Sequence, residues 1–165
     1  GDIHVAIYAL PEAIDDRFHA LPLFSDRFLI AVAPGHRFER QNAVRVSDLQ
    51  GEAYLRRASC EFADYARAIV SGQAVTVKRI YVSERDDWIQ SMIMAGLGYG
   101  FIPESAVAVP GLVLRPLVEP EIQRTVCLVT VRGRPHSPSV GAFVRQVVAH
   151  KWTNGGHGGR PKGVE

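Results

Sequence analysis

Apolar and polar residues alternate along this chain in segments whose period switches between that of a strand and that of a helix. Ile3, Val5 and Ile7 alternate with other residues, and this period of two predicts a half-buried strand. Residues 29–33 are continuously apolar and end at Pro34-Gly35, which is typical of a strand covered on both faces. Further strands are expected at residues 53–57, 75–82, 99–102, 112–118 and 125–131.

Three segments between these strands repeat apolar residues at i, i+3, i+4 and i+7, which predicts helices over residues 62–70, 88–96 and 140–148. The first helix should end at Ser71-Gly72, where glycine can adopt a left-handed conformation. Ser83 is expected to cap the second helix, because a hydroxyl satisfies its first free amides. The order of strands and helices predicts an α/β fold with helices packed on largely parallel strands.

Ligands in such sheets bind outside the carboxyl ends of strands, near helix N-termini, so residues 57–61 and 82–86 are the candidate sites. A helix dipole and neighbouring arginines would lower the pKa of the Cys60 thiol, although this residue could equally fill a small first-turn position. Arg56 and Arg57 face opposite sides of their strand, so only one can line a cleft, and both could be exposed. Ser83 and Arg85 either receive an anion or form a solvated helix entry.

Composition narrows the function classes. The chain has 165 residues, of which 47% are hydrophobic and 22% charged, as in a globular protein. Its longest apolar run, residues 28–33, is too short to span a membrane, and no leader segment is expected. The 19 basic and 17 acidic residues are dispersed, so the chain is not expected to grip DNA by itself. Two distant cysteines argue against a disulfide framework and favour a reducing compartment.

Several chemistries are disfavoured by the order of residues. Gly96, Gly98 and Gly100 follow a helix and precede a strand, the reverse of a dinucleotide-binding turn, so they indicate a helix cap and a close contact instead. The six histidines form no H-E-x-x-H motif, and no G-x-S-x-G motif occurs. No metal, cofactor or enzymatic activity is therefore expected. Cys127 lies in a strongly β-forming segment and should be a buried small apolar residue.

Four segments together resemble the effector-binding domain of LysR-type transcriptional regulators, a type 2 periplasmic-binding-protein-like fold: Gly1-Asp2-Ile3-His4-Val5-Ala6-Ile7, residues 28–38, Val46-Ser47-Asp48-Leu49, and Met92-Ile93-Met94-Ala95-Gly96-Leu97-Gly98-Tyr99-Gly100-Phe101-Ile102-Pro103. The resemblance covers about residues 1–150. His4, Arg37 and Phe38 depart from the family's usual aspartate, proline and leucine. The resemblance implies a two-lobed fold truncated at the N-terminus of the first lobe, without the winged helix-turn-helix and linker helix that would precede it.

The family's layout implies that residues 25–124 form regulatory lobe II and that residues 1–24 and 125–152 form part of lobe I. Residues 153–165 are expected to be a flexible, glycine-rich tail. The layout also implies an effector cleft between the lobes. Combined with the two strand–helix junctions, it gives these candidate effector-binding residues: Tyr8, Leu10, Arg57, Ser59, Cys60, Glu61, Phe62, Ser83 and Arg85.

The resemblance implies a cytoplasmic, non-enzymatic sensor that binds a small-molecule effector and passes a conformational change to the DNA-binding domain. DNA would be contacted only through that absent domain, in a full-length homodimer or homotetramer, with no membrane partner. The arginines and helix N-termini favour a small anion, such as a carboxylate. The alternatives are a periplasmic-type solute-binding protein and a thiol redox sensor centred on Cys60. A disulfide switch is disfavoured, because Ile69 stands where the peroxide-sensing members carry their second cysteine.

Overall fold

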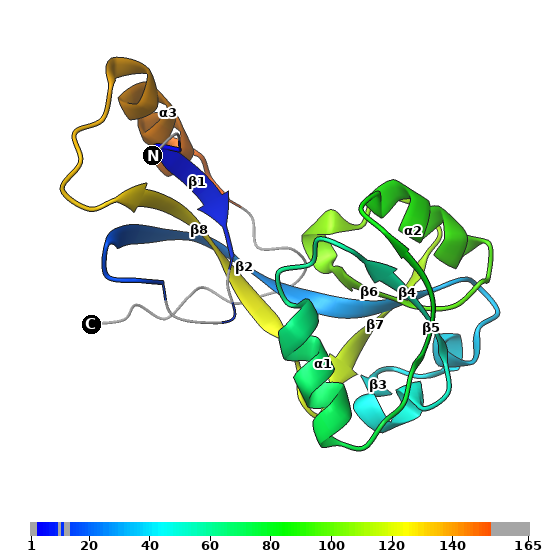
Figure 1. Ribbon diagram of the computed structural model, residues 1–165. Helices are drawn as coiled ribbons and strands as arrows, with labels where there is room; N and C mark the ends of the chain where they lie inside the picture. Colours follow the sequence, from blue (N-terminus) through cyan, green and yellow to red (C-terminus); the bar gives the residue numbers. More distant parts are fainter. Residues whose placement is uncertain (1–2, 10, 12–13, 153–165) are drawn as a thin grey trace. The chain divides into compact units, whose positions relative to one another are not determined.

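The computed structural model describes residues 3–9, 11 and 14–152 (Figure 1). The expected tail at residues 153–165 and the candidate residue Leu10 lie outside them. The elements in chain order are β1 Val5–Tyr8, β2 Phe18–Val32, β3 Val44–Arg45, β4 Ala53–Arg57, α1 Ala63–Gly72, β5 Lys78–Ser83, α2 Asp86–Met94, β6 Gly100–Pro103, β7 Val113–Val118, β8 Gln123–Val131 and α3 Pro138–Ala149. Short 3-10 helices occur at Arg37–Arg40, Val46–Leu49 and Glu104–Ala106.

The chain divides into two compact units. The first contains the described residues up to Asp26 and from Arg124 onward, and the second contains Arg27–Gln123. The long strand β2 runs through the boundary, and β8 begins just before it. Each unit has its own buried apolar residues, so each is treated by itself below.

The first unit is built on β1 and β8, which pair antiparallel with Ile7 opposite Leu128. Helix α3 begins at Pro138, and the Ser137 hydroxyl accepts a hydrogen bond from the backbone N–H of Val140, as expected of a serine N-cap. The indole of Trp152 donates to the carbonyl of Val147 at 2.9 Å, just beyond the helix. Cys127 is buried in β8, as predicted, and burial raises the pKa of its thiol.

The second unit contains the strands nearest the candidate site. The apolar half of β2 lies between β6 and β7, antiparallel to both, with Ile30 opposite Phe101 on one side and opposite Arg115 on the other. Residues 28–33 are all buried, which confirms the prediction of a strand covered on both faces. Strands β4 and β5 pair in parallel, and α1 connects them.

The expectation of largely parallel strands was wrong. Of the named pairings, only β3–β7 and β4–β5 are parallel, whereas β1–β8, β2–β6 and β2–β7 are antiparallel. Parallel neighbours need a long crossover connection: α1 alone joins β4 to β5, whereas β3 and β7 are joined through β4, α1, β5, α2 and β6. The overall fold is a mixed α/β fold.

Glycine was expected at the C-terminal ends of both α1 and α2, but the two helix ends differ in structure. Gly96 has a φ of +79° and ends α2, and a Cβ on Gly98 would lie 2.3 Å from the carbonyl oxygen of Ala53. This confirms the interpretation of these glycines as a cap and a close contact. Helix α1 ends at Gly72, as predicted, but the expectation of a left-handed glycine cap was wrong, because Gly72 is still helical and the left-handed residue is Ala74, with a φ of 55°.

Strand β4 has two differently occupied faces. Leu55 packs with Ile89 and Ile93 of α2 in an apolar cluster that is almost fully buried. The residues on either side of Leu55, Tyr54 and Arg56, line a cavity that is also lined by α1. Because successive side chains of a strand point to opposite faces, β4 separates the α2 layer from the α1 layer.

Candidate functional site

The carboxyl ends of β4 and β5 lie side by side in the second unit. Arg57 is opposite Ser83 in the parallel register, and the backbone N–H of Ala58 donates to the carbonyl of Ser83 at 2.8 Å. Helix α1 begins at Ala63, after the first of these strands, and α2 begins at Asp86, after the second. The two junctions singled out in the sequence are therefore brought together at one edge of the β4–β5 pair.

Arg57 is held against the first turn of α2. Its Nε donates to Oδ1 of Asp86 at 2.6 Å, and only 14% of its side chain is exposed. Burial is the largest single influence and lowers the pKa of Arg57, but the hydrogen bond to Asp86, together with the electrostatic attraction of Asp86, Cys60 and Glu61, raises it above its ordinary value. The Nη1 atom is buried and has no hydrogen-bond partner among the described residues. Arg57 therefore stays charged and keeps one donor unpaired.

The other side of this edge is the turn from β5 into α2. The Ser83 hydroxyl accepts from the backbone N–H of Arg85 at 3.0 Å, so it closes the turn before the helix. The expectation that Ser83 caps α2 was wrong, because Arg85 occupies the N-cap position without a side-chain cap. Arg85 donates through Nε and Nη2 to the two carboxylate oxygens of Asp87, and this pairing lowers the pKa of Asp87.

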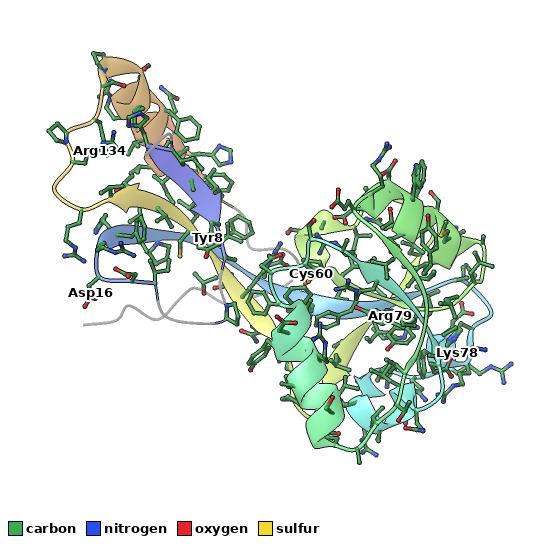
Figure 2. The ribbon with its side chains drawn as sticks, viewed as in Figure 1. Tyr8, Asp16, Cys60, Lys78, Arg79 and Arg134 are labelled. Carbon is green, nitrogen blue, oxygen red and sulfur yellow. The ribbon has the colours of Figure 1, made fainter. Side chains whose placement is uncertain are left out.

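The segment before α1 contributes four candidates of differing exposure. Ser59 is exposed, Cys60 and Glu61 are partly buried, and Phe62 is buried. Figure 2 shows Cys60 near the N-terminal end of α1, where its carbonyl accepts from the N–H of Ala63 at 3.0 Å. Among the described residues, Cys60 takes part in no disulfide. The ring of Phe62 packs against Phe28 with centroids 5.1 Å apart, so its side chain belongs to the core.

Seven of the predicted site residues thus fall at one edge of the second unit. The other two belong to the first part of the chain: Tyr8 lies in β1 with 40% of its surface exposed, and Leu10 is outside the described residues. The part that Tyr8 and Leu10 would play in a shared site stays a prediction.

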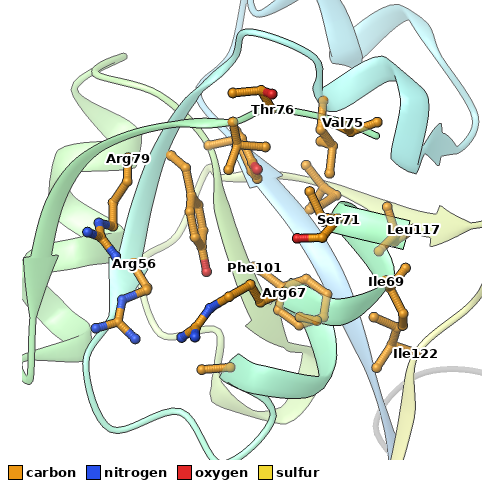
Figure 3. A pocket seen from close by; sticks show the side chains of 18 residues that line it. Arg56, Arg67, Ile69, Ser71, Val75, Thr76, Arg79, Phe101, Leu117 and Ile122 are labelled. Atoms are coloured by element: carbon orange, nitrogen blue, oxygen red, sulfur yellow. The ribbon is translucent and has the colours of Figure 1, made fainter. Parts of the chain in front are cut away.

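The sequence did not predict a cavity of about 530 Å³ inside the second unit (Figure 3). None of the predicted site residues lines it; Arg56, the neighbour of Arg57, does. The signal that could have found it is the alternation along β4, which puts Tyr54 and Arg56 on the face opposite Leu55.

Two properties of the described residues bear on other functions. None of the helices that the structure describes is both long and apolar enough to cross a lipid bilayer. Within the same residues, no group of three or more histidine, cysteine, aspartate or glutamate side chains is placed to hold a metal ion.

Comparison with known proteins gives related regulators. The chain is 28% identical over 143 residues to the transcriptional regulator OxyR of Escherichia coli (strain K12), with 82% of this chain and 46% of that protein covered. It is 22% identical over 157 residues to the HTH-type transcriptional regulator YwbI of Bacillus subtilis (strain 168), with coverages of 92% and 52%. The chain therefore spans about half the length of these relatives.

Solved structures share the fold. The C-terminal domain of a probable LysR family regulator from Rhodococcus sp. RHA1 has a TM-score of 0.78 at 17% identity, covering 90% of this chain and 75% of that one. The effector-binding domain of QuiR in complex with shikimate has a TM-score of 0.72 at 15% identity, covering 90% and 71%. These likenesses confirm the expected fold class.

The family itself follows from the sequence match. The LysR substrate binding domain family matches residues 1–152, which is nearly the whole chain. This confirms the resemblance drawn from the four segments, and with it the expectation of a non-enzymatic regulatory domain. The chain belongs to the LysR-type transcriptional regulators, of which it contains the effector-binding domain.

Proposed function

We propose that this domain senses a small anionic metabolite at the carboxyl ends of β4 and β5. The observation that carries the proposal is the register of the two strands, which places Arg57 opposite Ser83 and joins the two strand–helix junctions by a hydrogen bond. Backbone N–H groups at helix starts favour anions, and so does the buried, unpaired Nη1 of Arg57. Of the related structures, the QuiR domain is described with shikimate.

The proposed signal is a change in the population of two conformations. A ligand held at this edge would favour the arrangement of the domain to which it binds more tightly. The size of the response is limited by the difference in the ligand's affinity for the two arrangements. The change would reach DNA through an N-terminal winged helix-turn-helix domain, in a homodimer or homotetramer in the cytoplasm. The family match supports this role over that of a periplasmic-type solute-binding protein.

Isothermal titration with shikimate and a panel of small carboxylates, each beside a neutral analogue, tests the proposal. We expect at least one acid to bind, and the Arg57→Gln variant to bind it about tenfold more weakly, because a hydrogen bond to a charged group is lost. Arg134→Gln is the matched control, since Arg134 lies in the first unit, far along the chain and in no ion pair among the described residues (Figure 2). Binding of neutral compounds alone, or equal effects of the two variants, would contradict the anion site.

A thiol sensor is a second candidate, because one relative is the regulator OxyR and Cys60 lies near Arg57, whose pKa it helps to raise. The other cysteine, Cys127, is buried in the first unit, and Ile69 occupies the expected partner position in α1. The rate of Cys60 alkylation by iodoacetamide against pH separates the two ideas. A midpoint well below the ordinary value of about 8.5 would favour the sensor, and a midpoint near that value removes it.

A further inference from the structure

We propose that the cavity beneath α1 is a second ligand site, which takes an amphipathic organic anion. It lies entirely within the second unit and shares no lining residue with the edge that holds Arg57 and Ser83. Its volume of about 530 Å³ falls within the range of small-molecule sites. The proposal is independent of the effector site described above.

One side of the cavity is positively charged. Figure 3 shows the guanidinium groups of Arg56, Arg67 and Arg79 gathered on one side of the cavity. Its lining contains three arginines and neither aspartate nor glutamate. The Nε of Arg56 is buried without a hydrogen-bond partner, and neither Arg56 nor Arg79 has an ion-pair partner among the described residues. Arg67 forms an ion pair with the highly exposed Asp64, at 2.8 Å. An anion would satisfy donors that the protein leaves open.

The opposite wall of the cavity is apolar. Ile69, Leu117 and Ile122 lie across the cavity from the arginines in Figure 3. The stacked rings of Tyr54 and Tyr99, with centroids 5.1 Å apart, also line it. Burial raises the pKa of Tyr54 to about 12, so this phenol is neutral at pH 7 and does not repel an anion. A ligand that fits both walls carries an acidic head group on an apolar body.

Helix α1 leaves its apolar stripe incompletely buried. The helix has an apolar stripe, yet none of its residues is fully buried. Ala66, Ile69 and Val70 of that stripe line the cavity instead of closing on the sheet. An amphipathic helix normally buries its stripe, and here an apolar ligand body would complete that burial.

The test uses two fluorescent probes with nearly the same body. 8-Anilinonaphthalene-1-sulfonate carries an acidic head group, whereas N-phenyl-1-naphthylamine lacks it. We expect the sulfonate to bind the intact chain with a stoichiometry of one and at least tenfold more tightly than the neutral amine, because charge-assisted hydrogen bonds are the stronger ones. Near-ultraviolet circular dichroism must stay native, since the sulfonate also binds partly unfolded protein. Equal affinity for the two probes would overturn the proposal.

Matched variants locate the site. Arg56→Gln should weaken sulfonate binding about tenfold and leave amine binding unchanged, because only the head group loses a partner. Lys78→Gln removes the same charge from β5 beside Arg79 but outside the cavity (Figure 2), and should change neither. Ala66→Phe should block both probes by filling the cavity, whereas Ala68→Phe, at an exposed position of the same helix, should not. Equal effects of Arg56→Gln and Lys78→Gln, or unchanged binding in Ala66→Phe, would overturn the proposal.

Discussion

Replacing Gln90 with leucine is expected to lower the free energy of unfolding by about 3 kcal/mol, although the two side chains have similar sizes. Gln90 is 2% exposed on the inner face of α2. Its Nε2 donates to the carbonyl of Ala106 at 2.9 Å, and its Oε1 accepts from the N–H groups of Ala108 and Val109 at 2.8 and 3.0 Å. One side chain therefore satisfies three backbone groups of the segment that leads from β6 to β7.

Leucine would leave these three groups without partners, and each unpaired buried group costs about 1–3 kcal/mol. The segment is partly exposed, so water can replace some of the lost bonds, which is why the expected total is near the lower end. Urea unfolding followed by circular dichroism measures the change. Gln73→Leu is the control: Gln73 also donates to a carbonyl, that of Glu119, but it is exposed, and its loss should cost less than about 1 kcal/mol. Equal losses in the two variants would refute this explanation.

Asp26→Asn should be at least as damaging, with a loss of about 3–5 kcal/mol, because it removes the charge of one partner of a buried ion pair. The Asp26 side chain is completely buried in β2, and its Oδ2 accepts from Nη2 of Arg124 in β8 at 3.1 Å. Only 13% of the Arg124 side chain is exposed. The pair belongs to the first unit. Asp26 is the last residue of this unit before the chain enters the second unit, and Arg124 is the first residue after the chain returns.

The matched comparison for this pair is Asp15→Asn. Asp15 and Arg17 also form an ion pair in the first unit, at 3.0 Å, but both side chains are largely exposed. Exposed pairs are screened by water and contribute little to stability, so this variant should unfold close to the parent in thermal denaturation. A second check is Asp26→Leu combined with Arg124→Leu, which should recover much of the loss because apolar side chains then replace both partners of the ion pair. If Asp26→Asn unfolded like Asp15→Asn, the buried pair would not stabilise the first unit.

Most elements of the second unit could be predicted from the sequence, because their apolar period is strong. Strand β4 has the predicted bounds, and α1 and α2 cover most of the predicted stripes. Strand β2 was the largest miss: it begins at Phe18, eleven residues before the predicted run. The part of β2 before the predicted run contains Pro22 and the buried Asp26, so neither its period nor its propensity indicates a strand. This segment therefore becomes a strand through its pairing with other strands, not through its own sequence pattern.

The candidate site was partly predictable for the same reason. Residues 57–61 and 82–86 follow two recognisable strands, and their convergence requires only that β4 and β5 pair in parallel. The role of each arginine could not be predicted, because it depends on partners that are distant in sequence. Arg57 pairs with Asp86, 29 residues later, whereas Arg56 faces a cavity formed with α1, β5 and β7.

The most direct test of the account is nuclear magnetic resonance of the 15N-labelled chain, titrated with whichever carboxylate binds in calorimetry. We expect the largest amide shifts in residues 58–62 and 83–87, and Arg57→Gln should need about tenfold more acid to reach half of those shifts. If those amides stay unmoved while residues elsewhere respond to the saturating acid, the β4–β5 edge does not bind the effector.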